Sequence, residues 1–203
     1  DDFLRVNVSG TLNLLEAARK FVPDARIVLI TSSAMYGIAE AADGVIHEDS
    51  ALRPVNPYGV SKATQHLIGY QYVAQHKLDV VRVCPFNLTG YGLPKGLVAS
   101  DFACQIVAIE RRIQEPIIQV GDLSGKRDFL DVQDAVSALV RLVDAGKAGE
   151  SYNLASAQAV PIIDLLHDML SMSSATIDVQ PRPKKKKNTG STGSARSSVH
   201  NSV

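Results

Sequence analysis

The sequence predicts an α/β fold built on a mostly parallel sheet. Segments with helical periodicity alternate along the chain with short apolar runs bounded by turn residues, which is the pattern of strand–helix–strand units. The apolar runs are nearly continuous, as in strands buried on both faces, and the connections are long enough for right-handed crossovers. With 203 residues, 45% of them apolar, the chain can form one domain with a true core.

Two helices and two strands are expected in the first half of the chain. Residues 2–20 place apolar side chains at the spacing of an amphipathic helix. Residues 26–30 are a short apolar run between turn signals, which is typical of a buried parallel strand. Residues 37–57 read as a long loop, whose length is typical of functional or covering segments. A helix at 58–76 and a second buried strand at 79–84 follow.

The second half continues the alternation. We expect a Pro- and Gly-bearing loop at 85–97, a helix at 98–114, a strand at 117–120, a helix from Asp131 to Gly146, a strand at 152–155 and a helix at 161–170. An aspartate before the fourth helix and a glycine after it are the residues that commonly cap and stop helices.

The zero net charge conceals two segments of opposite charge. Residues 181–203 carry six basic residues and no acidic one, so residues 1–180 contain 15 basic against 21 acidic residues. The basic segment is rich in Ser and Gly and lacks apolar periodicity, which predicts a folded domain at 1–180 and a disordered tail at 181–203. A mildly acidic domain does not resemble a nucleic-acid binder.

Several protein classes are disfavoured by composition. No apolar run is long enough to span a membrane, and the first residues lack the character of a signal peptide. Cys84 and Cys104 do not form a disulfide framework, and no Cys/His spacing suggests a metal site. We therefore expect a cytoplasmic protein with no metal, membrane or nucleic-acid partner.

Tyr58 and Lys62 are the strongest candidates for chemistry. They are four residues apart at the start of a predicted helix, so their side chains lie one turn apart on the same face. An ammonium at that position favours the ionised form of a phenol, and a hydroxyl from Ser32 would complete a proton-transfer site for alcohol and ketone chemistry. The spacing alone is weak, since a solvated helix surface produces it by chance.

Further polar residues follow the two buried strands. Ser32 and Ser33 come directly after the first strand, and Pro85, Phe86 and Asn87 come after the second. Ligands of open α/β sheets bind beyond the carboxyl ends of the strands. Each residue alone would more often be a cap or a turn former, but their convergence on the start of the Tyr58 helix favours a functional site.

Six segments, all in the same order, resemble those of the extended short-chain dehydrogenase/reductase family of nucleotide-sugar epimerases, dehydratases and reductases. They are residues 7–18, 31–37, 56–62, 84–90, 127–132 and 149–153. The resemblance covers residues 3–171 and implies a Rossmann-like, doubly wound sheet with part of a small C-terminal substrate domain.

The resemblance also implies residue roles and a cofactor. Tyr58 would be the acid/base at the sugar C4 oxygen, Ser32 the third catalytic group, and Lys62 the ligand of the nicotinamide ribose of NAD or NADP. Tyr58 would also contact this cofactor, as would Pro85.

Three residues are assigned by the resemblance to the nucleotide-sugar substrate. Ser33 and Asn87 would contact it, and Arg127 would grip its diphosphate, a task suited to a bidentate guanidinium. An ion pair with a neighbouring aspartate is the alternative interpretation of Arg127.

Within the family, residues 98–106, 120–123 and 126–129 look most like the GDP-4-keto-6-deoxy-D-mannose reductases. Such an enzyme would pass hydride from NAD(P)H to the C4 ketone while the tyrosine delivers a proton. Dehydratases carry acidic residues just after the catalytic hydroxyl, and Ser33 and Ala34 stand there in this chain, which argues against dehydration. A UDP-sugar 4-epimerase, which uses the same three residues with bound NAD, is the alternative.

The sequence contains no G-x-x-G-x-x-G turn, which the family places upstream of the first matching segment. We therefore expect an N-terminally truncated member with a partial sheet, which alone binds dinucleotide poorly. A non-catalytic fragment that acts as a binding module, through an open sheet edge or the basic tail, is the alternative from another class. In an intact parent, the resemblance implies a homodimer through helices 2–20 and 58–76.

Overall fold

The computed structural model describes residues 2–37 and 45–182. The helices are η1 (a π-helix, Leu4–Ser9), α1 (Gly10–Phe21), η2 (a 3-10 turn, Ser33–Met35), α2 (Pro57–His76), α3 (Val98–Glu110), α4 (Val132–Ala145) and α5 (Ile162–Ser171). The strands are β1 (Ile27–Ile30), β2 (Val80–Pro85), β3 (Asn87–Thr89), β4 (Ile117–Val120), β5 (Lys126–Asp131), β6 (Ser151–Leu154), β7 (Ala159–Pro161) and β8 (Asp178–Pro181).

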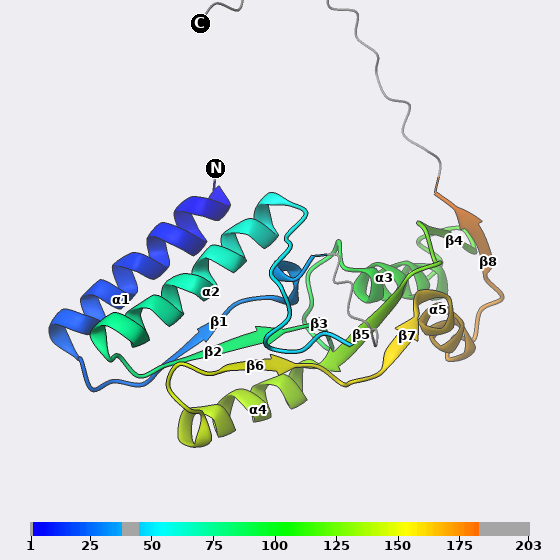
Figure 1. Ribbon diagram of the computed structural model, residues 1–203. Helices are drawn as coiled ribbons and strands as arrows, with labels where there is room; N and C mark the ends of the chain where they lie inside the picture. Colours follow the sequence, from blue (N-terminus) through cyan, green and yellow to red (C-terminus); the bar gives the residue numbers. More distant parts are fainter. Residues whose placement is uncertain (1, 38–44, 183–203) are drawn as a thin grey trace, which may run out of the picture.

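The first lobe is an all-parallel sheet with helices on both faces. The strand order is β1-β2-β6, with α1 and α2 on one face and α4 on the other (Figure 1). The central strand is fully buried at Val80, Val81, Val83 and Cys84. Such a nearly continuous apolar run suits a strand that is covered from both sides. Figure 1 shows that the carboxyl ends of all three strands point toward the rest of the molecule.

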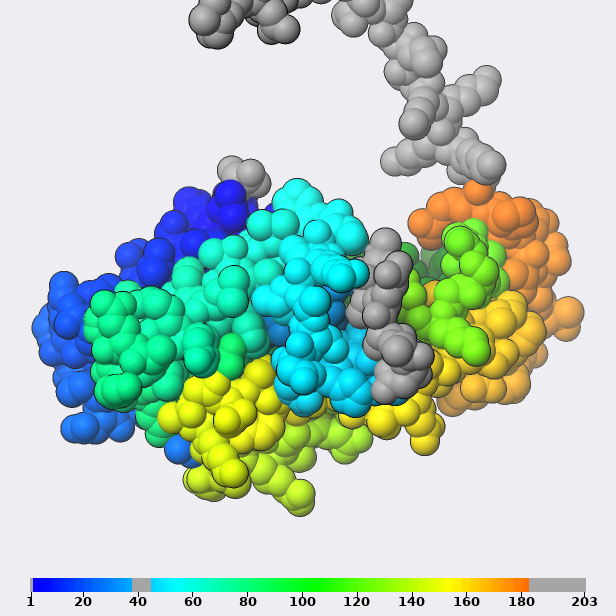
Figure 2. All heavy atoms as spheres, in the orientation of Figure 1, coloured from blue at the N-terminus to red at the C-terminus, as the bar shows by residue number. Residues whose placement is uncertain are grey.

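The second lobe contains β3, β4, β5, β7, β8, α3 and α5, and lies at one end of the molecule (Figures 1 and 2). Strand β5 pairs with β3 in parallel and with β7 antiparallel, while β4 and β8 form a separate parallel pair. Its core joins Phe102 and Ile106 of α3 to Ile118 of β4 and Leu166 of α5. The second lobe therefore has an apolar core of its own.

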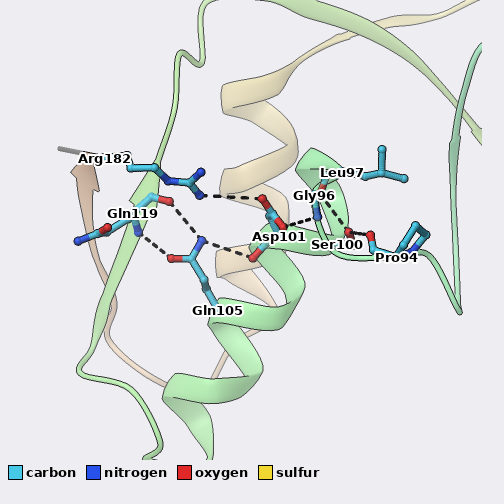
Figure 3. A network of polar contacts seen from close by, with 8 residues as sticks. All are labelled: Pro94, Gly96, Leu97, Ser100, Asp101, Gln105, Gln119 and Arg182. Carbon is cyan, nitrogen blue, oxygen red and sulfur yellow. Dashed lines mark hydrogen bonds and ion pairs between the residues drawn. The ribbon is translucent and has the colours of Figure 1, made fainter. Parts of the chain in front are cut away.

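A side-chain amide joins α3 to the edge of β4 (Figure 3). Gln105 Oε1 accepts a hydrogen bond from the Gln119 backbone N–H at 2.9 Å, and its Nε2 donates to the Gln119 carbonyl at 3.2 Å. At the start of the same helix, Asp101 accepts from the Gly96 backbone N–H at 2.8 Å and lies 3.9 Å from Arg182. These contacts satisfy backbone groups that an edge strand and a helix start otherwise leave unpaired.

The predicted α/β class with parallel strands is confirmed, and most element positions are close to those expected. The prediction of a loop throughout 85–97 was wrong, because β3 forms inside it. The helix expected at 98–114 ends at Glu110, and two residues later Arg112 has a left-handed φ of 56° that cannot continue a helix. Strand β5 was not predicted, because its polar sequence has no apolar run.

Two further expectations concern the chain beyond the core. Strand β8 runs to Pro181 and Arg182 donates its backbone N–H to the Val120 carbonyl at 2.7 Å, so strand pairing extends past residue 180. The rest of the predicted tail, 183–203, and positions 38–44 of the predicted loop lie outside the described residues. Within the described residues, no helix is long and apolar enough to cross a membrane.

Candidate active site

A cleft of about 1250 Å³ lies between the two lobes. The first lobe lines it with residues from the end of β1 and the start of α2, and the second lobe lines it with residues of β3 and β5. Of the residues predicted from the sequence to form the site, five line this cleft: Ser32, Ser33, Tyr58, Asn87 and Arg127. Lys62 and Pro85 are not among the residues that line it.

Ser32 stands where the first strand turns into η2. Its backbone is extended, with φ −168°, and its Oγ accepts a hydrogen bond from the Ala34 backbone N–H at 3.3 Å. The hydroxyl thus caps the short helix, as serine commonly does at this position. The cap also fixes the hydroxyl at the cleft wall, so the capping role and the predicted catalytic role are compatible.

Tyr58 occupies the first turn of α2. The helix is started by Asn56, whose Oδ1 accepts a hydrogen bond from the Gly59 backbone N–H at 2.8 Å, and by Pro57, whose fixed φ suits the first helical position. The phenol is half-buried and lines the cleft, and its ring makes an edge contact with Phe3 at 5.5 Å between centroids.

Lys62 lies one turn further along α2, behind the Tyr58 ring. Its Nζ is 6.0 Å from the centroid of that ring, which is close enough for the charge to act on the phenol. The ammonium donates to the Ile30 carbonyl at 3.1 Å and to Gln65 Oε1 at 2.9 Å. Burial lowers the pKa of Lys62. The predicted pairing of the tyrosine and the lysine is therefore present in the structure.

A second tyrosine near the site is unsuited to proton transfer. Tyr36 is fully buried, and its hydroxyl donates to Asn153 Oδ1 at 2.9 Å. Burial raises the pKa of Tyr36, and the nearby thiol of Cys84 raises it further. Since Tyr36 has no exposed surface, it can support the cleft wall but cannot meet a ligand as Tyr58 can.

The second lobe supplies polar and basic groups to the opposite wall. Asn87 Nδ2 donates to the Asp128 carbonyl at 2.9 Å and so ties β3 to β5. The Arg127 side chain is exposed, and its Nη1 donates to the Lys126 carbonyl at 2.8 Å. In residues 2–37 and 45–182, no ion pair joins Arg127 to an acidic side chain, so the alternative of an aspartate partner finds no support. Lys126 lines the same wall and was not predicted.

Two residues of the site, Lys62 and Pro85, are suited to binding a nicotinamide dinucleotide. Lys62 has three N–H donors and uses two of them in the contacts above, which leaves a donor for a ribose hydroxyl. Pro85 ends β2 opposite Leu154 of β6, at the sheet edge where dinucleotides bind in α/β folds. The residues present fit the nicotinamide end of such a cofactor. Across the described part of the chain, no group of His, Cys, Asp or Glu side chains could hold a metal ion.

The residues that hold α2 in place were not predicted from the sequence. Asn7 Nδ2 donates to Ser61 Oγ at 2.9 Å, and Ser61 Oγ donates to the Tyr58 carbonyl at 2.7 Å. One turn further along both helices, Gln65 Nε2 donates to Thr11 Oγ1 at 2.9 Å. Polar residues four apart on both segments, Asn7 with Thr11 and Ser61 with Gln65, were the available signal, but their pairing depends on how the helices cross.

Comparisons with known proteins identify the family of the chain. A sequence profile of the GDP-mannose 4,6 dehydratase family matches residues 1–202. GDP-6-deoxy-D-mannose reductase from Pseudomonas aeruginosa is 34% identical over 182 residues, which make up 90% of this chain and 60% of that protein. dTDP-glucose 4,6-dehydratase from Neisseria meningitidis serogroup B is 29% identical over 162 residues, or 75% of this chain and 44% of that protein.

A solved structure shares the fold. The structure of RMD from Pseudomonas aeruginosa complexed with NADPH superposes with a TM-score of 0.84 at 34% identity, covering 88% of this chain and 60% of that one. The chain therefore spans 60% or less of the length of these relatives.

Proposed function

The chain belongs to the GDP-mannose 4,6 dehydratase family, and on that premise we propose that it forms the catalytic part of an NAD(P)-dependent nucleotide-sugar oxidoreductase. We propose further that its reaction is the reduction of the C4 ketone of a GDP-4-keto-6-deoxyhexose. The observation that carries the proposal is the meeting of Ser32 and Tyr58 at one cleft, with the Lys62 ammonium 6.0 Å from the Tyr58 ring.

The proposed proton transfer begins at Tyr58. Its phenol donates the proton that the C4 oxygen takes up as the ketone becomes an alcohol. The Lys62 ammonium stabilises the tyrosinate left behind, and Ser32 Oγ donates a hydrogen bond to the same sugar oxygen. NADPH or NADH, when bound, supplies the hydride that reaches the C4 carbon.

Substrate binding is assigned to both walls of the cleft. Arg127 carries a planar guanidinium that suits the oxygens of a diphosphate, and its exposed position leaves it accessible. Asn87 and Ser33, which also line the cleft, offer hydrogen bonds to the rest of the nucleotide sugar. This division puts the reacting sugar at the first lobe and the diphosphate at the second.

The residues that follow Ser32 bear on the choice of reaction. Ser33 and Ala34 follow Ser32 and carry no acid that could remove water across C5 and C6, which favours reduction over dehydration.

Exposed apolar side chains lie on η1, α1 and α2, including Leu4, Leu14 and Leu67. An apolar surface of this kind is typical of interfaces, so we propose a homodimer through these helices.

The test is a substrate comparison. The chain, expressed together with any coding sequence that precedes it in frame, is given NADPH and GDP-4-keto-6-deoxymannose, and NADPH oxidation is followed by absorbance. The proposal expects oxidation matched by formation of a GDP-6-deoxyhexose. Interconversion of UDP-glucose and UDP-galactose with bound NAD, without net oxidation, would assign the site to a 4-epimerase. Absence of both reactions would favour a binding module and refute the proposed activity.

A further inference from the structure

The Lys62 ammonium is held by a buried chain of side chains that crosses from α1 to α2. Thr11 of α1 accepts a hydrogen bond from Gln65 Nε2, and Gln65 Oε1 accepts one from Lys62 Nζ, both at 2.9 Å. Thr11 is 5% exposed and Gln65 is 8% exposed. A buried polar side chain in a helix interface stabilises little unless its hydrogen bonds are made, and both ends of this amide are paired.

The acceptor that Gln65 offers is neutral, which matters for the charge of Lys62. The other acceptor of the ammonium is the backbone carbonyl of Ile30, also neutral. Within the described ranges, no carboxylate forms an ion pair with Lys62. A carboxylate at position 65 would bind the ammonium equally well but would cancel much of the positive potential that reaches Tyr58.

We propose that Gln65 is a positioning residue that fixes the Lys62 ammonium against Tyr58 while leaving its charge unneutralised. The inference rests on the proposed function, in which Tyr58 is the proton donor. Thr11 is the anchor on α1 that sets the orientation of the amide: because its hydroxyl accepts from Nε2, Oε1 is turned toward the lysine. The amide is suited to this task because it pairs one donor and one acceptor across two helices.

Two substitutions at Gln65 have opposite expected effects on Lys62. Gln65→Glu places a carboxylate beside the ammonium, so the Lys62 titration moves to higher pH by about one unit, a tenfold change in proton affinity. Gln65→Met has a similar shape but no acceptor, so the charged ammonium loses a hydrogen bond and the Lys62 titration moves to lower pH.

The experiment is an NMR titration of the chain with isotope-labelled lysine, in which the Lys62 signal is assigned with Lys62→Arg. Gln71→Glu is the matched control: Gln71 is exposed on the same helix and its side chain bonds to Gln75, two turns or more from Lys62. We expect Gln71→Glu to leave the Lys62 titration within a few tenths of a unit of the wild type, since surface charges at that separation are screened.

The outcomes separate this inference from the proposed activity. Opposite movements of the Lys62 titration in the two Gln65 variants support the positioning role. Unchanged titrations in Gln65→Glu, or in Gln65→Met should the glutamate variant not fold, would overturn it, as would movement of Lys62 in the same direction in both. Since no substrate is present in this titration, a failed substrate comparison would refute the proposed reaction without affecting this result.

Discussion

Arg82 lies in the middle of the central strand and is only 8% exposed. Its guanidinium donates to His66 Nε2 at 2.5 Å and to the Gly149 carbonyl at 2.6 Å, and it lies 5.1 Å from the Tyr70 ring. Because arginine stays charged, His66 must be neutral to accept this hydrogen bond. Burial lowers the pKa of His66 to about 4, and the Arg82 charge adds to the effect.

This pair predicts loss of stability in mild acid. The pKa of His66 falls from 6.5 in the unfolded chain to about 4 in the fold, so the unfolded chain binds the extra proton first. The neutral form of His66 contributes about 3 kcal/mol to the free energy of unfolding. This stabilisation is fully present above about pH 6.5 and is lost as the pH falls toward about 4. Urea denaturation across this range should show a weaker pH dependence for His66→Gln than for the wild type. His167→Gln, at an exposed position on α5, should follow the wild type; equal slopes for all three proteins would contradict the assignment.

Residues close in sequence were the most predictable part of the site. The pairing of Tyr58 with Lys62 follows from helical spacing, and Asp131 caps α4 as expected, accepting from the Gln133 backbone N–H at 2.7 Å. The contact of His66 with Arg82 joins a helix to a strand 16 residues away. No local pattern specifies such a contact, because it depends on how the helix is rotated over the sheet.

At the scale of elements, the site depends on close contact between α2 and η2. Gly59 is buried in the first turn of α2, and a Cβ built on it would lie 2.5 Å from the Ala34 carbonyl oxygen. Since that oxygen belongs to the backbone, it cannot move aside as a flexible side chain would. The missing side chain at Gly59 lets the helix that carries Tyr58 pack directly on the turn that begins at Ser32.

Gly59→Ala should therefore destabilise the protein despite the better helix propensity of alanine. We expect a loss of about 1–3 kcal/mol from overpacking, together with displacement of Tyr58 from Ser32. Gly10→Ala is the matched control, because a Cβ there meets nothing closer than the Arg5 carbonyl oxygen at 3.9 Å, and alanine should stabilise the helix by about 1 kcal/mol. Thermal denaturation of both variants checks the pair: a Gly59→Ala protein as stable as Gly10→Ala would disprove the packing argument.

The elements themselves were predictable in proportion to their apolar content. Strands β1 and β2 are apolar runs, and both were found, but only β2 is buried as predicted: in β1, which pairs with β2 alone, Leu29 is buried and Ile30 is 45% exposed. Strands β3 and β7 have three residues each and β5 is mostly polar, so their formation depends on pairing across the second lobe. The π-helical turn η1 was not predicted either. Its residues follow a helical apolar pattern, and that pattern does not distinguish a π-helical turn from an α-helix.

At the scale of the whole molecule, the proposed function assigns different tasks to the two walls of the cleft. The first lobe holds Ser32 and Tyr58, the proposed proton-transfer groups, at the carboxyl end of a parallel sheet, where α/β proteins place their ligands. The second lobe, with its own core, presents Arg127 and Asn87. The residue types at this cleft were predictable by resemblance, whereas the opposing arrangement of the two walls, including Lys126, required the three-dimensional fold.

The most direct test of the account is the turnover number of Tyr58→Phe, measured by NADPH oxidation with GDP-4-keto-6-deoxymannose in the protein expressed with any coding sequence that precedes it in frame. Removing only the hydroxyl leaves the ring packed on Phe3, so the fold and the KM should change little. We expect the turnover number to fall about 10²–10⁴-fold, the usual contribution of a positioned acid. A variant that turns over at the wild-type rate would contradict the assignment of Tyr58 as the proton donor.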